Sequence, residues 1–228
     1  MANATPNGKL TAGAIGNFLL GGAAALFVLT IGLAAFGGAK MDEGSATGAG
    51  IGLLVTFVLI VGGGITGSLG WFGLGSVRGG TNALAGIFSI VLGLVPILVI
   101  ALAMGTAESA MKSGDLAAAQ SRGASIGTVA LILAFGVPAL LGVFGGLGIM
   151  SGKSGLAKPA GLVMLLGGLG CALLLVLSFL TTDLGSMKVP MLFANPTLST
   201  IGLYVGFFGL AVGLILSGAA MLGERQKA

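Results

Sequence analysis

Residues 61–80 read VGGGITGSLGWFGLGSVRGG, and nine of these twenty residues are glycine. Apolar residues flank the stretch on both sides, with FVLI at 57–60 and ALAGIF at 83–88. A glycine-rich run in such a setting is a phosphate-binding loop, a flexible linker, or a helix whose glycines admit a close neighbour. The composition of the whole chain and the spacing of its charges decide among these three structures.

The composition indicates a protein that uses lipid as its solvent. Of the 228 residues, 56% are hydrophobic and only 7% are charged, whereas a soluble globular domain carries about 25% charged residues. So few charges cannot cover the surface of a soluble protein of this size. We therefore expect an integral membrane protein, with the lipid bilayer as its first partner.

Six long apolar stretches lie between the clusters of charged residues. Each is about 20 residues or longer, which suits an α-helix that crosses a hydrocarbon core about 30 Å thick. The stretches lack the apolar–polar alternation of barrel strands, and helices satisfy their own backbone groups in lipid. We therefore predict an all-α, polytopic membrane protein, a single domain over residues 1–228 with six transmembrane helices at about 11–37, 49–76, 83–105, 125–150, 159–181 and 198–222.

The ends of these predicted helices suggest an internal repeat. Ala-Gly pairs open the odd-numbered helices, and the even-numbered helices end in small residues that precede or adjoin Arg78, Lys153 and Arg225. The landmarks recur every 71 to 75 residues, which predicts three parallel helical hairpins over about 9–80, 81–155 and 156–226. Coincidence in a chain with 45 glycines is the alternative. Tandem hairpins of this kind resemble the rotor-ring subunits of rotary ATPases, but those subunits carry a mid-helix carboxylate that the six predicted spans lack.

Two nucleotide-binding patterns come close to matching, and both fail. Gly152-Lys153-Ser154 matches the end of a P-loop, but the first required glycine falls at position 147, which is leucine. Gly73-x-Gly75 is followed by Gly79, one residue too late for a dinucleotide-binding turn. The glycines instead favour close helix packing, because small residues four apart let two helices approach in lipid. The candidate packing residues are Gly63, Gly67, Gly70, Gly75, Gly79, Gly148, Gly152, Ala219 and Gly223.

The basic residues predict an orientation for the chain. The termini and the even-numbered loops hold six Lys and Arg residues, and the odd-numbered loops hold four. The positive-inside rule therefore places both termini in the cytoplasm, and we expect a bacterial inner membrane. Aromatic and basic side chains favour the headgroup region, so the candidate interface anchors are Trp71, Arg78, Lys153 and Arg225.

The predicted spans lack the groups that membrane chemistry usually requires. They contain no charged residue, and the chain has no histidine. Proton paths, haem ligation and metal catalysis in membranes depend on such groups. We therefore expect a protein that is not an enzyme, with no catalytic, metal or cofactor site. Nucleic acid is not an expected partner, because the basic residues stand singly at helix ends.

Three residues inside the spans are candidates for a hinge or a cavity. Pro96 and Pro138 lie near the middle of the third and fourth helices, where each removes a backbone hydrogen bond and should kink its helix. They form either well-packed kinks or a hinge or cavity near the bilayer midplane. Asn17, the one amide well inside a predicted span, makes either an interhelical hydrogen bond or a contact with a solute.

Two functions are compatible with these features. The favoured one is a non-catalytic subunit that contributes to the assembly or structure of a larger membrane complex through glycine-mediated packing, with homo- or hetero-oligomeric membrane protein partners. The alternative is a passive channel or facilitator for a small neutral or apolar solute. The loop 182–197 contains the apolar segment VPMLF, and we expect it to lie in the membrane interface or dock on a partner.

Overall fold

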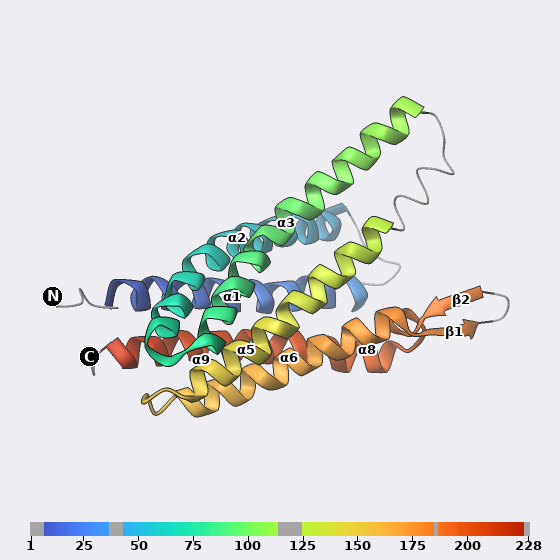
Figure 1. The fold of residues 1–228 in the computed structure, drawn as a ribbon. Coiled ribbons are helices and arrows are strands. Elements are labelled where there is room, and N and C mark those ends of the chain that lie inside the picture. Colours follow the sequence, from blue (N-terminus) through green and yellow to red (C-terminus); the bar gives the residue numbers. More distant parts are fainter. Residues whose placement is uncertain (1–6, 37–42, 114–124, 185–186, 226–228) are drawn as a thin grey trace.

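The computed structural model describes residues 7–36, 43–113, 125–184 and 187–225 of the chain (Figure 1). Six of its helices are long and apolar enough to cross a membrane. This confirms the expected number of membrane-length helices and indicates an integral membrane protein. The six spans are Gly8–Thr30, Gly50–Arg78, Gly80–Leu102, Ser125–Met150, Ala157–Phe179 and Thr197–Glu224.

Four of the spans are uninterrupted α-helices. They are α1 (Asn7–Phe36), α2 (Glu43–Arg78), α3 (Gly80–Ser113) and α6 (Ala157–Phe179). α3 continues past Pro96 without a break in its assignment as helix.

The fourth and sixth spans each contain one π-helical turn. In the fourth span, the turn η2 (Ile132–Gly136) directly precedes α5 (Val137–Met150). Pro138 lies in the first turn of α5, where its missing N–H is tolerated because the wider turn before it breaks the α-helical hydrogen-bond register. The sixth span consists of α8 (Pro196–Leu203), η3 (Tyr204–Phe208) and α9 (Gly209–Arg225).

A short antiparallel hairpin precedes the sixth span. Strands β1 (Thr181–Leu184) and β2 (Met187–Pro190) pair and lead into the one-turn helix α7 (Met191–Ala194). No hairpin was expected here, although the sequence carries a signal for one in the Gly-Ser pair between two short runs. The side chain of Asn195 then accepts a hydrogen bond of 3.1 Å from the N–H of Leu198 and caps α8, which begins at a proline.

The spanning helices form a closed ring in chain order. Each of α1, α2, α3, α5, α6 and α9 packs against the next, and α9 packs back against α1. α1 begins and α9 ends on one side of the bundle, together with the turns that join α2 to α3 and α5 to α6 (Figure 1). We call this side the terminal end and the opposite side the far end. The helices lie close together at the terminal end, whereas α3 and the segment before α5 spread away from α1 and α9 toward the far end (Figure 1).

The packing does not single out three hairpin units over 9–80, 81–155 and 156–226. α2 packs extensively against α3, which belongs to the next predicted hairpin, whereas α3 and α5 share a smaller interface although they belong to the same one. In a closed ring each helix packs against both the helix before it and the helix after it. Such packing does not distinguish contacts inside a hairpin from contacts between hairpins. The threefold repeat stays a hypothesis.

Neighbouring helices in the ring approach each other at glycine. A Cβ atom on Gly70 of α2 would lie 2.5 Å from the Cα atom of Gly13 of α1. The same distance of 2.5 Å separates a Cβ on Gly142 of α5 from the Cα of Gly168 of α6. Real Cβ atoms do not approach backbone this closely, so these helix pairs depend on the missing side chain.

Gly79 was predicted to be a packing residue, and this prediction is wrong. A Cβ on Gly79 would meet no atom within 4 Å. Gly79 instead ends α2 with φ at 101°, and its N–H donates a 3.1 Å hydrogen bond to the carbonyl of Gly75. Glycine is favoured here because the left-handed backbone conformation that turns the chain from α2 into α3 is strained for other residues.

Replacing Gly142 with alanine should destabilise the protein by about 2 kcal/mol, because the new methyl group forces α5 away from α6. The thermal unfolding midpoint of the purified protein in mild detergent measures this loss. Gly62→Ala is the matched control, since a Cβ on Gly62 would have no atom within 4 Å. Equal midpoints for the two variants would contradict the role assigned to the α5–α6 contact.

Candidate apolar binding site

A cavity of about 250 Å³ lies within the ring, in the half of the bundle toward the far end. Five of the six spans contribute to its wall, and α6 does not. Every described residue that lines it is apolar. The lining residues are Leu20, Ala23, Ala24, Phe27, Phe57, Ile60, Leu92, Val95, Pro96, Val99, Ala130, Ala134, Pro138, Phe207, Leu210 and Leu214.

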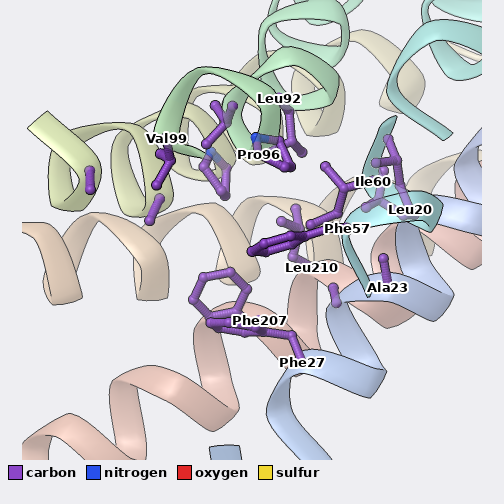
Figure 2. A pocket seen from close by; sticks show the side chains of 16 residues that line it. Leu20, Ala23, Phe27, Phe57, Ile60, Leu92, Pro96, Val99, Phe207 and Leu210 are labelled. Atoms are coloured by element: carbon purple, nitrogen blue, oxygen red, sulfur yellow. The ribbon is translucent and has the colours of Figure 1, made fainter. Parts of the chain in front are cut away.

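Aromatic side chains form one side of this pocket. The rings of Phe27 and Phe207 pack with their centroids 5.0 Å apart, and the ring of Phe135, outside the pocket wall, lies 6.1 Å from that of Phe207. Phe57 extends from α2 toward the same space (Figure 2). Such rings bring a large apolar surface to a ligand while losing little conformational freedom.

Both mid-span prolines lie on the pocket wall. Pro96 comes from α3 and Pro138 from α5. Because proline has no N–H, the carbonyls four residues earlier, those of Leu92 and Ala134, lose their usual helical partner. Leu92 and Ala134 also line the pocket. The prolines therefore shape the wall and release backbone acceptors beside it.

A layer of buried polar side chains lies one helical turn from the pocket toward the terminal end. Asn17, Ser89 and Ser217 are all fully buried. Each stands three residues from a pocket leucine, namely Leu20, Leu92 and Leu214 respectively, and so on the same helix face as that leucine. The pocket therefore contains Pro96 and Pro138 of the predicted hinge residues, whereas Asn17 lies beneath its floor.

An ion pair joins the helices at the terminal end. The guanidinium of Arg78 lies 2.5 Å from the carboxylate of Glu224, and the two side chains are only 15% and 8% exposed. The other oxygen of Glu224 accepts a 2.6 Å hydrogen bond from the N–H of Ser154, in the turn between α5 and α6. Arg78 was predicted to anchor the chain to headgroups, but it instead links α2 to α9 within the protein.

Trp71 was predicted to lie at the membrane interface, and this prediction is wrong. Its side chain is fully buried, and a Cβ on Gly145 of α5 would lie 3.3 Å from its ring. Trp71 follows Gly67 by one turn on the face of α2 that points into the ring, which explains its burial. Of the other predicted anchors, Lys153 is exposed, and the side chain of Arg225 lies outside the described residues.

The remaining predicted packing residues occupy three regions. Gly63, Gly67 and Gly70 of α2 face α1, and Gly75 faces Ala83 at the start of α3. Gly148 of α5 faces the side chain of Asn82, and Gly152, in the turn after α5, lies near that of Arg78. At the terminal end, Gly223 faces Ser154, and Ala219 is partly buried.

Sequence reasoning missed Asn82 and Glu224. Both are buried. Asn82 lies one residue before the start of the predicted third span, and Glu224 lies two residues after the end of the predicted sixth span. Glu224 therefore places a carboxylate within a spanning helix that had been expected to hold none. On each of α1, α3 and α9, a polar residue stands three positions from a leucine. This spacing was the signal in the sequence for the polar layer.

Comparisons with known proteins add no assignment. No family model matches the chain. Searches of curated proteins and of solved structures likewise find no significant match. The function is therefore argued from the pocket and the residues around it.

Replacing Glu224 with glutamine should destabilise the protein by about 3 kcal/mol, because it leaves the buried guanidinium of Arg78 without its counter-charge. The double variant Arg78→Met/Glu224→Leu should recover most of this loss, since it removes both buried charges together. Thermal unfolding in detergent measures both effects. Lys158→Met, at an exposed position near the same end, is the control. A double variant no more stable than Glu224→Gln would contradict the pairing.

Proposed function

We propose that this protein is a non-catalytic integral membrane protein that takes up an apolar molecule from the bilayer into the central pocket, as a facilitator or carrier. The observation that carries the proposal is the pocket wall, which is apolar at every described position and includes the mid-span prolines of two helices. This is the function expected as the alternative in the sequence analysis, and the pocket now favours it.

The chemistry of the wall selects the class of ligand. A charged or strongly polar solute would lose its hydration in the pocket without gaining partners there, at a cost of several kcal/mol. A hydrocarbon group has no such hydration to lose, and it gains dispersion contacts with the closely spaced aliphatic and aromatic groups of the wall. A volume of about 250 Å³ suits a short hydrocarbon chain or a small ring system.

The arrangement of the helices supports entry from the lipid side. The pocket lies in the half of the ring where the helices spread apart toward the far end (Figure 1). At the terminal end, the ion pair between Arg78 and Glu224 joins α2 to α9. An apolar molecule dissolved in the bilayer is therefore expected to enter between the spread helices.

Photolabelling tests this function with a decane analogue that carries a diazirine. In the wild-type protein in lipid nanodiscs, labelling of peptides from α3 and η3 should be saturable and should be displaced by decane. Ala134→Trp should weaken the competition by decane at least roughly tenfold, because the indole fills the pocket. Ile132→Trp is the matched control, since Ile132 lies in the same turn η2 but is 44% exposed on the outer surface.

Labelling that follows only the outer surface of the helices, with no saturable component, would refute this function. Saturable labelling that survives in Ala134→Trp would place the binding site elsewhere in the protein.

One observation favours the role of an assembly subunit. Beyond Pro96, α3 exposes large apolar side chains on several sides, including Ile97 at 53%, Leu98 at 47% and Met104 at 68%. A helix with so few neighbours has a surface that a partner can cover. Purification in mild detergent tests this role, because a subunit should co-purify with a partner at fixed stoichiometry. A protein that purifies without a partner and still binds decane would contradict the subunit role and support the facilitator role.

A further inference from the structure

The hydrogen bonds of Asn17 fix the orientation of its amide group. The hydroxyl of Ser217 donates a 2.8 Å hydrogen bond to the carbonyl of Leu214, so it can only accept from a second partner. Asn17 lies 2.9 Å from this hydroxyl and must therefore present its Nδ2 there. The oxygen Oδ1 then faces the opposite way, into the ring.

The Oδ1 atom of Asn17 is an acceptor without a donor. It is fully buried and has no hydrogen-bond partner among the described residues. A buried acceptor left in this condition costs about 1–3 kcal/mol, so native proteins rarely keep one without a role.

A second acceptor lies near it. The hydroxyl of Ser89 donates a 3.0 Å hydrogen bond to the carbonyl of Gly64, so its free capacity is also that of an acceptor. A Cβ on Gly67 would lie 3.2 Å from Asn17 Oδ1 and 3.1 Å from Ser89 Oγ. Both oxygens thus lie close to Gly67 in the interior of the ring, where the absence of a side chain on Gly67 lets them approach α2.

A third acceptor lies beside the wall of the pocket. The carbonyl of Leu92 loses its helical partner because Pro96 has no N–H. Leu92 stands one turn from Ser89, and its side chain forms part of the pocket wall. Two buried acceptors, Asn17 Oδ1 and Ser89 Oγ, thus lie beneath the floor of the apolar pocket, and the carbonyl of Leu92 lies beside its wall. The unpartnered donor of Trp71 lies one turn farther on α2, where the ring faces Gly145.

We propose that the ligand of the pocket is a hydrocarbon chain that ends in an uncharged hydrogen-bond donor, of which a primary alcohol is the simplest. The chain occupies the apolar pocket, and the O–H group donates to Asn17 Oδ1 or Ser89 Oγ. Its entry requires a rotamer change in one of the floor leucines, a motion that is fast on the scale of binding. This inference rests on the proposed function of the pocket and adds the chemistry of the ligand's polar end.

Competition among three matched probes tests the proposal in the photolabelling assay, with each affinity corrected for partition of the probe into lipid. 1-Decanol should compete about tenfold better than decyl methyl ether, which has an oxygen but no donor, and better than decane. Asn17→Leu should abolish the advantage of the alcohol while decane competes as before. Ser89→Ala is a smaller change and should reduce the same advantage of the alcohol. It provides the test of the proposal if Asn17→Leu does not fold.

Ser178→Ala is the control for the loss of a buried hydroxyl, because Ser178 is buried and, among the described residues, its hydroxyl donates within α6 to the carbonyl of Leu174 at 2.8 Å. It should leave the preference for the alcohol intact. Equal competition by the alcohol and the ether would overturn the inference and leave the apolar pocket standing. A preference that persists in both Asn17→Leu and Ser89→Ala would also overturn it. Absence of competition by any of the three probes would instead refute the proposed function itself.

Discussion

The close approach of helix backbones at glycine is the constraint on which the rest of this structure depends. In lipid, apolar side chains gain nothing by leaving their solvent, so van der Waals contact must hold the helices together. Glycine-to-glycine contacts join α1 to α2, α2 to α3, α5 to α6 and α6 to η3, at Gly13–Gly70, Gly64–Gly93, Gly142–Gly168 and Gly170–Gly206. Toward the far end, a Cβ would meet no atom within 4 Å at Gly48, Gly50, Gly105 or Gly127. Close glycine contacts therefore extend from the terminal end to the level of the pocket, where Gly206 adjoins the pocket residue Phe207, and they are absent at these four outer positions.

The same glycines determine where polar side chains can be buried. Gly145 and Gly148 of α5 and Gly152 in the turn after it receive the side chains of Trp71, Asn82 and Arg78 from α2 and α3. Each of these three side chains keeps a buried nitrogen or oxygen atom without a partner among the described residues. Such atoms weaken a helix interface, whereas the ion pair between Arg78 and Glu224 joins α2 to α9.

Two features could be predicted from the sequence because they depend on the kinds of residue and their spacing along the chain. The clustering of charges identified six membrane-length helices, and the prolines indicated the depth of the pocket. The inward direction of Trp71 could not be predicted, because these helices are apolar on every face and show no clear core side. Asn82 and Glu224 were missed because the ends of predicted helices are uncertain by a few residues. Gly79 matched the packing pattern, but a glycine that ends a helix and one that contacts a neighbour have the same spacing in the sequence.

The polar layer combines two features that the sequence presented separately. Hydroxyl groups inside helices usually donate to a carbonyl of their own or a neighbouring helix, as Ser217 and Ser89 do. Proline removes a donor from the backbone and leaves a carbonyl behind. A serine beside a pocket and a proline in its wall therefore have the same effect: each leaves a hydrogen-bond acceptor unused near the pocket. The side chain of Asn17 carries both a donor and an acceptor. Because its amide N–H donates to Ser217, the group that Asn17 leaves unused is its oxygen, which is an acceptor as well. The proposed preference for a neutral donor rests on Asn17 and Ser89 beneath the floor of the pocket and on Pro96 in its wall, with no charged group among the described residues that line it.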